Sequence, residues 1–512
     1  MNGAESLVQT LLRAGIDTCF ANPGTSEMHF VAALDRNPSM RSVLCLAEGV
    51  VTGAADGYGR MKNDAAVTLL HCGPGLANGL SNLHNARRAR TPVVNLVGDQ
   101  ASYHRALDPP LASDTEGWAR AVSAWTRTAG SAATAGADLA VAIQAARTSP
   151  GQIATLITPA DICWDEGGVV ADPLPSPAMP PVAPHRIVEI ARLLRGGEKV
   201  VLFLGGNALG STALADAHRI AQATGATLIT HHFNGRMARG QGRFPIHRLA
   251  YAIEQAVATL AGTKHLVLIG ATPPVARFAH PGKPGLMAPP DASIHVFARP
   301  EQDAAAALAA LADELGAPAV SVPAIKAPGP AAKGAVTPDS VTQTLAALLP
   351  EGAIVIDESV SFGRSFFSGM AGAAPHDWLQ STGGAIGSGL PMATGAAVAA
   401  PGRRVVCLQG DGSAMYTVAA LWTQAREKLP VTTVIMANRK YAILLGELAN
   451  VGANAGRIAL DMLDIGRPNI DWCQIANGMG VEAGRAETME EFADLFTTAN
   501  RAAGPFLIEL VI

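Results

Sequence analysis

Short runs of apolar residues alternate with helix-like segments along the whole chain. The runs are rich in Val, Ile and Leu, and each is followed by Gly, Asp, Asn or Ser. This pattern is typical of parallel strands buried on both faces, with a crossover helix after each strand. The sequence therefore predicts an α/β fold whose functional sites form where strands end and helices begin. The predicted strands are residues 42–46, 66–70, 93–97, 200–204, 265–269, 353–356, 405–408 and 431–436.

Two proline-dense stretches, residues 171–184 and 322–338, interrupt this rhythm. Proline at this density cannot continue a helix or a central strand, so both stretches are predicted to be extended linkers. They leave three segments, each long enough to bury its own core. We therefore expect three doubly wound parallel-sheet domains, at residues 1–170, 185–321 and 336–512.

Composition narrows the class of protein. The 512 residues include 38 Lys and Arg against 42 Asp and Glu, and this near-neutral balance argues against a nucleic-acid partner. A hydrophobic content of 49% with 16% charged residues excludes a disordered protein. No apolar run reaches the roughly 18 residues that span a bilayer, so no membrane partner is expected. The first residues predict an amphipathic helix rather than a signal peptide, and we expect a cytoplasmic protein.

The six cysteines contain no CxxC pair, so the sequence carries no signature of a zinc site. Cys19, Cys45 and Cys407 lie in apolar stretches and are predicted to be buried, reduced thiols. Cys72 lies beside His71 in a glycine-rich turn, and its role is left open.

Candidate chemistry is clearest in the third segment. A predicted buried strand ends in Gly410-Asp411-Gly412, and the next strand ends just before Asn438. Adjacent parallel strands would bring the carboxylate and amide oxygens to one edge of the sheet. Two hard oxygens there suit a Mg²⁺ or Ca²⁺ ion that bridges to a diphosphate.

This arrangement resembles the metal–diphosphate motif of thiamine diphosphate (ThDP) enzymes. The stretch GDGSAMYTVAALWTQAREKLPVTTVIMANRKYAILL resembles the branch that contains benzoylformate decarboxylase and acetolactate synthase, and the likeness covers nearly the whole chain. It implies that Asp411, Asn438 and the carbonyl of Lys440 ligate the metal. Ala437 departs from the family, which usually has Asn there. The resemblance also implies a pyrimidine-binding, a central and a diphosphate-binding domain, in that order.

Two residues of the first segment stand out. From its position alone, Glu48 is a first-turn helix carboxylate, followed by small residues such as Gly53 and Gly57 that allow close packing. By resemblance it is the activating glutamate, which hydrogen-bonds the pyrimidine N1′ and favours the imino tautomer. His71 is either a core histidine or, by resemblance to benzoylformate decarboxylase, a proton-transfer residue near the substrate.

Three further residues have open alternatives. Thr25 and Ser26 either cap a helix that begins around Glu27 or bind an anion. By resemblance, Thr25 occupies the position of a substrate-binding serine. His280, in the central segment, resembles the second active-site histidine of these decarboxylases, with a register open by one residue.

The resemblance assigns further residues to the cofactor, with Ile386 as the apolar support beneath the thiazolium. The cofactor set is Glu48, Ser359, Gly384, Ile386, Gly410, Asp411, Gly412, Ser413, Asn438 and Tyr441. The Gly205–Asn207 turn raises the question of FAD. Because it lacks G-x-G-x-x-G and a following acidic residue, FAD is not favoured.

The implied activity is ThDP- and Mg²⁺-dependent decarboxylation of a 2-oxo acid, which gives an aldehyde or a carboligation product. Ile443 and Glu447 fall in the expected substrate region. Glu447 stands where aromatic-substrate decarboxylases have an aromatic residue, and the Gln-Trp of acetolactate synthases is missing. These departures argue against aromatic substrates and pyruvate self-condensation. The alternatives are an acetolactate-synthase-type carboligase and a silent ThDP-binding paralogue.

The resemblance also implies a homodimer at least, because family sites combine the first and third domains of different chains. A homotetramer is common in the family.

Overall fold

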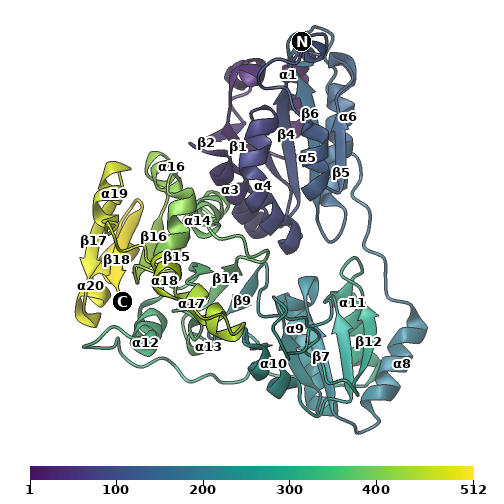
Figure 1. Ribbon diagram of the computed structural model, residues 1–512. Coiled ribbons are helices and arrows are strands. Elements are labelled where there is room, and N and C mark those ends of the chain that lie inside the picture. The colour runs from purple at the N-terminus through teal and green to yellow at the C-terminus, as the bar shows by residue number, and fades with distance from the viewer.

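Each third of the chain forms its own sheet in the computed structural model, which describes residues 1–512 (Figure 1). The strand orders are β2-β1-β3-β4-β6-β5, then β10-β8-β7-β11-β12, then β17-β18-β16-β15-β13-β14-β9. Helices lie between most successive strands, although none lies between β8 and β10 or between β11 and β12, so the predicted three-sheet α/β fold is confirmed.

The N-terminal unit has a wholly parallel six-stranded sheet. Its strands are β1 (Thr18–Asn22), β2 (Arg41–Leu44), β3 (Ala66–Leu70), β4 (Val93–Asp99), β5 (Trp125–Thr128) and β6 (Ile153–Pro159). Its helices are α1 (Gly3–Arg13), η1 (Thr25–Glu27), α2 (Met28–Asp35), α3 (Glu48–Lys62), α4 (Cys72–Ala89), η2 (Arg105–Leu107), α5 (Thr115–Val122), α6 (Ala132–Arg147) and α7 (Ala160–Trp164).

The central unit has a five-stranded parallel sheet. Its strands are β7 (Val200–Leu204), β8 (Thr227–Thr230), β10 (His247–Arg248), β11 (His265–Ile269) and β12 (Ser293–Ala298). Its helices are α8 (Pro184–Leu194), η3 (Gly206–Leu209), α9 (Ser211–Thr224), α10 (Ile253–Leu260) and α11 (Ala304–Glu314).

The C-terminal unit has the largest sheet. Its own strands are β13 (Ile354–Glu358), β14 (His376–Gln380), β15 (Val405–Gly410), β16 (Val431–Ala437), β17 (Glu482–Ala486) and β18 (Phe506–Val511). Its helices are α12 (Pro338–Leu348), α13 (Phe366–Gly369), α14 (Gly389–Ala399), α15 (Asp411–Ala414), η4 (Met415–Thr417), α16 (Ala420–Arg426), α17 (Ala442–Asn450), α18 (Arg457–Asp461), α19 (Trp472–Gly478) and α20 (Met489–Arg501).

All eight predicted strands are present, with ends that differ by at most two residues. The two proline-dense stretches contain no strand, and each ends where a proline begins a helix, at Pro184 and at Pro338. Proline suits the first helical position because its missing N–H would have no intrahelical partner there. No helix is both long enough and apolar enough to cross a bilayer. All six cysteines are free, and Cys19, Cys45 and Cys407 are buried as predicted.

One strand departs from the predicted wholly parallel sheets. Strand β9 (Met237–Arg239) belongs to the central segment by sequence but pairs antiparallel with β14 of the C-terminal sheet. Beside it, Arg236 Nε donates to Asp377 Oδ1 at 2.9 Å. The prediction missed β9 because three residues are too short to show a periodic pattern.

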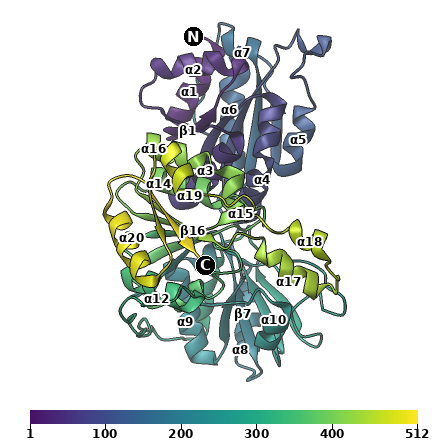
Figure 2. The same cartoon turned by 60° about the vertical axis from the view of Figure 1, so that its left-hand side comes forward.

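The C-terminal unit shares a hydrophobic core with each of the other two. One cluster of buried side chains joins it to the central unit, and another joins it to the N-terminal unit. Helices α3 and α14 make the second junction and lie side by side in Figures 1 and 2. A Cβ added at Gly57 would lie 2.1 Å from Met392 O, and one at Gly395 would lie 1.8 Å from Ala54 O. The glycines are therefore required by the close approach of the two helices.

Candidate active site

The first group of polar side chains lies where β1 and β3 end. Residues Thr25–Glu27 follow β1, and His71 follows β3 as the N-cap residue of α4. The two strands are neighbours in parallel register, with Asn22 opposite Leu70. The segments that follow them therefore meet at one edge of the sheet.

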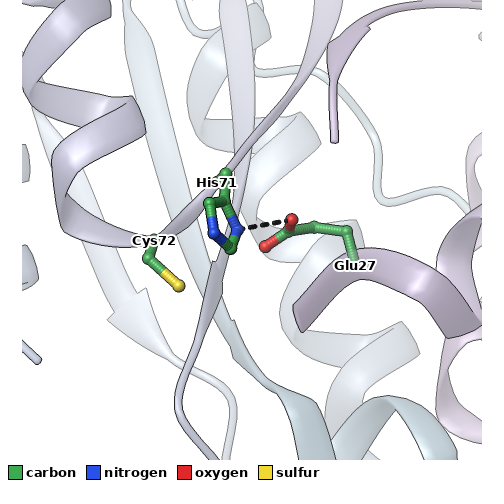
Figure 3. Close-up of side chains that lie close together, drawn as sticks. All are labelled: Glu27, His71 and Cys72. Carbon is green, nitrogen blue, oxygen red and sulfur yellow. Dashed lines mark hydrogen bonds and ion pairs between the residues drawn. The ribbon is translucent and has the colours of Figure 1, made fainter. Parts of the chain in front are cut away.

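Glu27 holds the imidazole ring of His71 (Figure 3). Nδ1 of His71 lies 2.9 Å from Oε2 of Glu27, whose side chain is 1% exposed. Ser26 Oγ donates to Glu27 and lies 3.2 Å both from His71 Nδ1 and from Cys72 Sγ. Because an ionised carboxylate only accepts hydrogen bonds, Nδ1 carries the proton toward Glu27. Nε2 is then the ring atom left for a ligand.

A cavity of about 330 Å³ opens beside this group, and Thr25, Ser26, His71 and Cys72 form one of its walls. Asp99, the last residue of β4, forms another wall. Its side chain is 1% exposed, and its Oδ2 accepts no hydrogen bond, although Arg105 Nε lies 3.4 Å away. Burial raises the pKa of Asp99, against the opposing effects of a backbone hydrogen bond and of Arg105.

The helix-cap interpretation of Thr25 and Ser26 is wrong. The N-cap residues of η1 and α2 are Gly24 and Glu27, so neither Thr25 nor Ser26 caps a helix, and the N–H of Gly24 donates to Glu27 Oε2 at 2.7 Å. The Ser26 hydroxyl instead contacts Glu27, His71 and Cys72, because the turn directs it across the sheet edge. Both residues line the cavity.

Glu48 is the first residue of α3, as expected from the sequence. It is 8% exposed, and Asn78 Nδ2 donates to its Oε2 at 3.2 Å. A Cβ added at Gly75 would lie 2.9 Å from Oε1, so a glycine at this point of α4 leaves room for the carboxylate. No cation pairs with Glu48 within 4 Å.

Asp411 and Asn438 follow the neighbouring parallel strands β15 and β16, whose register pairs Gly410 with Met436. Asp411 accepts backbone N–H bonds from Gly412 at 2.8 Å and from Arg439 at 2.6 Å. Asn438 Oδ1 accepts the N–H of Lys440 at 3.0 Å.

The backbone around Lys440 is held by a bridge to Asp464. The carbonyl of Arg439 and the N–H of Tyr441 form hydrogen bonds to that second segment. Alternate residues of an extended chain point to opposite sides. The carbonyl of Lys440 therefore points away from this partner, to the side on which its N–H meets Asn438.

A divalent cation fits the chemistry of this turn. Asp411 is buried, and no Lys, Arg or His pairs with its carboxylate within 4 Å. Burial raises the pKa of Asp411, and the backbone hydrogen bonds only partly offset this. A buried carboxylate beside an amide oxygen and a carbonyl is the hard-oxygen set that Mg²⁺ and Ca²⁺ prefer.

The glycine-rich loop before α14 is organised by Glu358, a residue that the sequence analysis passed over. Oε1 of Glu358 accepts the N–H of Gly387 at 2.9 Å, and Oε2 accepts the N–H of Gly389 at 2.6 Å and Gln409 Nε2 at 2.9 Å. Burial raises the pKa of Glu358 in spite of these donors. The loop that carries Gly384 and half-buried Ile386 is therefore anchored by Glu358 at its end, and Asn85 of α4 also bonds the N–H and the carbonyl of Ala385.

The other predicted cofactor residues are distributed around the same strand ends. Ser359 is buried and donates to Asp357 Oδ1 at 2.6 Å. Ser413 accepts from Gln409 Nε2 at 2.6 Å and donates to the carbonyl of Gly410 at 3.0 Å. The ring of Tyr441 lies so close to Gly412 that a Cβ there would be 2.5 Å from it.

His280 and Glu447 form a pair between the central and C-terminal units. Nε2 of His280 lies 2.8 Å from Oε2 of Glu447, on helix α17. Nδ1 of His280 is buried and has no hydrogen-bond partner. Ile443, one turn earlier on α17, is half-buried.

The predicted site residues thus fall into separate groups around His71, Asp411 and His280. The hydrogen bonds and ion pairs within these groups were not predicted, and no functional role was assigned to Glu27, Asp99 or Glu358 from the sequence. Each of them lies at or just after a strand end, which is the signal that did identify Asp411 and His71.

Three sheets in this order, with an acidic turn after a strand of the third, define the class of thiamine diphosphate enzymes. Residues 1–118 match the family described as "Thiamine pyrophosphate enzyme, N-terminal TPP binding domain". Residues 366–510 match "Thiamine pyrophosphate enzyme, C-terminal TPP binding domain". The chain belongs to the thiamine diphosphate-dependent enzyme family of acetolactate synthase and benzoylformate decarboxylase.

Three relatives define this likeness. The chain is 53% identical over 514 residues to the Mycobacterium tuberculosis protein named "Putative acetolactate synthase large subunit IlvX", covering 100% of this chain and 99% of the relative. It is 30% identical over 531 residues to benzoylformate decarboxylase of Pseudomonas aeruginosa, covering 98% and 97%. Its structure is similar to that of the thiamine diphosphate-dependent 4-hydroxybenzoylformate decarboxylase of Rhodococcus jostii, with a TM-score of 0.86, 26% identity, and coverage of 99% and 98%.

Proposed function

We propose that this protein decarboxylates a non-aromatic 2-oxo acid with thiamine diphosphate and Mg²⁺. The observation that carries the proposal is the His71–Glu27 pair at the wall of the 330 Å³ cavity. By resemblance, benzoylformate decarboxylase-like enzymes have a histidine at this position and typical acetolactate synthases do not.

Residues of the N- and C-terminal units would hold the cofactor. Glu48 would hydrogen-bond the pyrimidine N1′. Asp411, Asn438 and the Lys440 carbonyl would ligate Mg²⁺ at the diphosphate, and Ile386 would support the thiazolium. The bound cofactor supplies a nucleophilic carbon and an electron sink for loss of CO₂. The remaining cofactor contacts would come from Ser359, Gly384, Gly410, Gly412, Ser413 and Tyr441.

Two histidines are suited to move protons. His71 offers Nε2, because Glu27 engages its Nδ1. His280 offers Nδ1, because Glu447 engages its Nε2. Each carboxylate fixes its imidazole ring in one orientation, so that a proton can be transferred at a defined atom.

Because the groups around His71 and His280 are separate within one chain, the substrate would lie between His71 of one chain and His280 of a second chain. Thr25 and Ser26 line the cavity, and their hydroxyls would bind the substrate carboxylate. Ile443 and Glu447 would border the substrate side chain. A carboxylate in place of an aromatic ring makes this border polar, which disfavours an aromatic substrate because Glu447 would lose hydration against the ring.

Carboligation is the second candidate reaction. The 53% identical relative carries an acetolactate synthase name, and the two reactions share the step that releases CO₂. They differ in whether a proton or a second carbonyl compound captures the product of that step. Because family active sites combine domains of different chains, we further propose a homodimer as the smallest active form. We propose that two such dimers form a homotetramer, which is common in the family.

The experiment is an assay of CO₂ release by the purified protein with thiamine diphosphate and Mg²⁺. The panel holds short aliphatic, branched, polar and aromatic 2-oxo acids, with Glu48→Gln as the matched blank. We expect release from non-aromatic acids that falls at least about 100-fold in the variant, since it lacks a catalytic proton. Equal release by both proteins would refute the role of Glu48.

Product analysis then separates the two candidates. Free aldehyde identifies a decarboxylase, whereas a 2-hydroxy-3-oxo acid that yields acetoin or a homologue on acidification identifies a carboligase. Cofactor binding without CO₂ release from any acid would instead identify a silent ThDP-binding protein. Asp411→Ala, measured for Mg²⁺-dependent cofactor retention, tests the metal turn independently of turnover.

A further inference from the structure

We propose that Glu27, His71 and Cys72 form a binding site for a zinc ion, distinct from the Mg²⁺ turn at Asp411. The three side chains come from segments separated in sequence, on η1 and at the start of α4. No spacing motif in the sequence identifies these three residues as a group, and they meet only because β1 and β3 are neighbouring strands.

The geometry is nearly that of a metal site. One ligand atom of each residue lies within 4.8 Å of the others. Bonds of about 2.0–2.3 Å in a tetrahedron separate ligand atoms by about 3.5 Å, so shifts of about 1 Å complete the site. Ser26 Oγ now lies among the three side chains, 3.2 Å from both His71 Nδ1 and Cys72 Sγ. Rotation of Ser26 about χ1 would vacate this position for the ion.

The donor set selects the metal. Thiolate and imidazole ligands suit Zn²⁺, whereas Mg²⁺ and Ca²⁺ require oxygen ligands. Three protein ligands leave a fourth position open, which a further ligand could reach from the 330 Å³ cavity that His71 and Cys72 line. Asp99 supplies a second indication, because it lines the same cavity with a buried carboxylate oxygen that accepts no hydrogen bond and that faces only the ion-pair partner Arg105, 3.4 Å away. A cation in the cavity would satisfy this oxygen, directly or through water.

A second group in the chain offers the same kinds of atoms but is already neutralised. Asp471, Cys473 and Glu509 also lie within 4.8 Å of one another. There, Arg485 Nη2 lies 3.2 Å from Asp471 and 3.0 Å from Glu509. No arginine or lysine pairs with Glu27 within 4 Å, and its partners are Ser26, His71 and the N–H of Gly24, so the first group has a carboxylate that no permanent cation neutralises.

Zinc at this site would compete with the proposed proton transfer, because it would bind the imidazole of His71 from the side of Nδ1 and would lie at the wall of the cavity. This consequence rests on the proposed function, whereas zinc binding itself does not. The site would therefore make the enzyme reversibly sensitive to zinc, with activity restored by a chelator.

The test uses the full-length, chelator-treated protein in saturating Mg²⁺, which occupies the hard-oxygen turn. Titration with ZnCl₂ in a calorimeter should show one site per chain. Cys72→Ser should weaken binding by at least about tenfold, since even outer-shell partners of metal ligands are worth about 10–100-fold in affinity. With Co²⁺ as the probe, a thiolate-to-cobalt charge-transfer absorption should appear in the wild type and be absent from Cys72→Ser.

Cys473→Ser is the matched control and should bind zinc as the wild type does. Loss of the site in Cys473→Ser but not in Cys72→Ser would overturn the proposal, and so would the absence of zinc binding to the wild type. If circular dichroism shows that Cys72→Ser is misfolded, Glu27→Gln replaces it and should also weaken binding. Because these measurements need no substrate, failure of the decarboxylase assay leaves them interpretable.

Discussion

At the scale of single residues, buried carboxylates determine what their neighbours can do. Glu27 leaves only Nε2 of His71 for a ligand, and Glu447 leaves only Nδ1 of His280. Glu358 acts on backbone instead, since it gathers the N–H groups of the loop before α14. Each carboxylate therefore acts by orienting another group, and each has a testable effect.

Glu27→Gln should lower kcat about 10- to 100-fold and leave KM nearly unchanged. The amide keeps the size of the side chain but removes the charge that accompanies proton transfer by His71, an effect on the scale of general acid–base catalysis. Steady-state kinetics on the best 2-oxo acid, with bound thiamine diphosphate measured alongside, would check this. A raised KM with normal kcat would show that Glu27 acts in substrate binding instead.

Sequence reasoning located the strand ends but not the bonds between them. Each of His71, Glu48 and Asp411 follows an apolar run at a turn, but only Asp411, with Asn438, was assigned a role from position and chemistry, and the roles of His71 and Glu48 came from the family resemblance. Sequence reasoning missed Glu27 because its bond to His71 depends on the register of β1 against β3, which no local pattern encodes. It also gave no sign of the group formed by Cys72, because the partners are distant in sequence.

At the scale of elements, α3 and α14 approach each other so closely that glycine is required at Gly57 and Gly395. Sequence reasoning predicted the small-residue face of α3 from Gly53 and Gly57, but not its partner helix, which lies more than 300 residues away along the chain. Strand β9 was missed for a related reason, since a three-residue strand is defined only by its partner β14. At this scale, the sequence therefore did not predict which helices and strands pair when they are distant along the chain.

Gly395→Ala should destabilise the protein by about 1–3 kcal/mol, the usual cost of overpacking a tight core. The added methyl group would lie 1.8 Å from the carbonyl oxygen of Ala54, which is backbone and cannot rotate away. Thermal unfolding checks this, with Gly504→Ala as the control, because nothing lies within 4 Å of a Cβ there. Equal melting temperatures for the two variants would contradict the packing argument.

Asp377→Asn should lower stability at neutral pH by about 1–3 kcal/mol, the cost of leaving hydrogen-bonded groups without their partner. Burial alone would raise the pKa of Asp377, but hydrogen bonds and charge from Arg236 and Arg403 lower it below 3.8 overall. A depressed folded-state pKa stabilises the fold above the unfolded-state pKa and loses this effect as pH falls through the folded-state value.

The melting temperatures of wild type and Asp377→Asn should therefore differ most from pH 7 down to about 5 and converge as pH falls below about 4. Asp138→Asn is the control, since that carboxylate pairs only with Arg127, whose side chain is 49% exposed. A gap that widened toward low pH would contradict the ion-pair explanation.

At the scale of the whole molecule, the three units are not independent domains joined only by linkers. The C-terminal unit shares a core with each of the others, so the linkers connect parts that already touch. The groups around His71, Asp411 and His280 nevertheless remain separate within the chain. Completion of a site by a second chain follows from the proposed dimer.

Mixing two inactive variants tests this completion. Glu48→Gln and Asp411→Ala each damage a different unit, so a mixed dimer would contain one intact site and one doubly damaged site. After dissociation and random reassociation, about a quarter of wild-type activity should return, because half of the dimers are mixed and each has one of two sites. Activity that stays at the level of the separate variants would place both residues in one site of a single chain.

Strand β9 also bears on how such a protein can be recombined or cut into pieces. A fragment that begins after the second linker would leave β14 without its edge strand and open the core that the central and C-terminal units share. A bare edge strand is a template for aggregation. The central and C-terminal units should therefore be kept together when the chain is divided. A breakpoint in the exposed stretch before Pro184 would keep every sheet whole, but a foreign N-terminal unit would have to rebuild the core shared with the C-terminal unit.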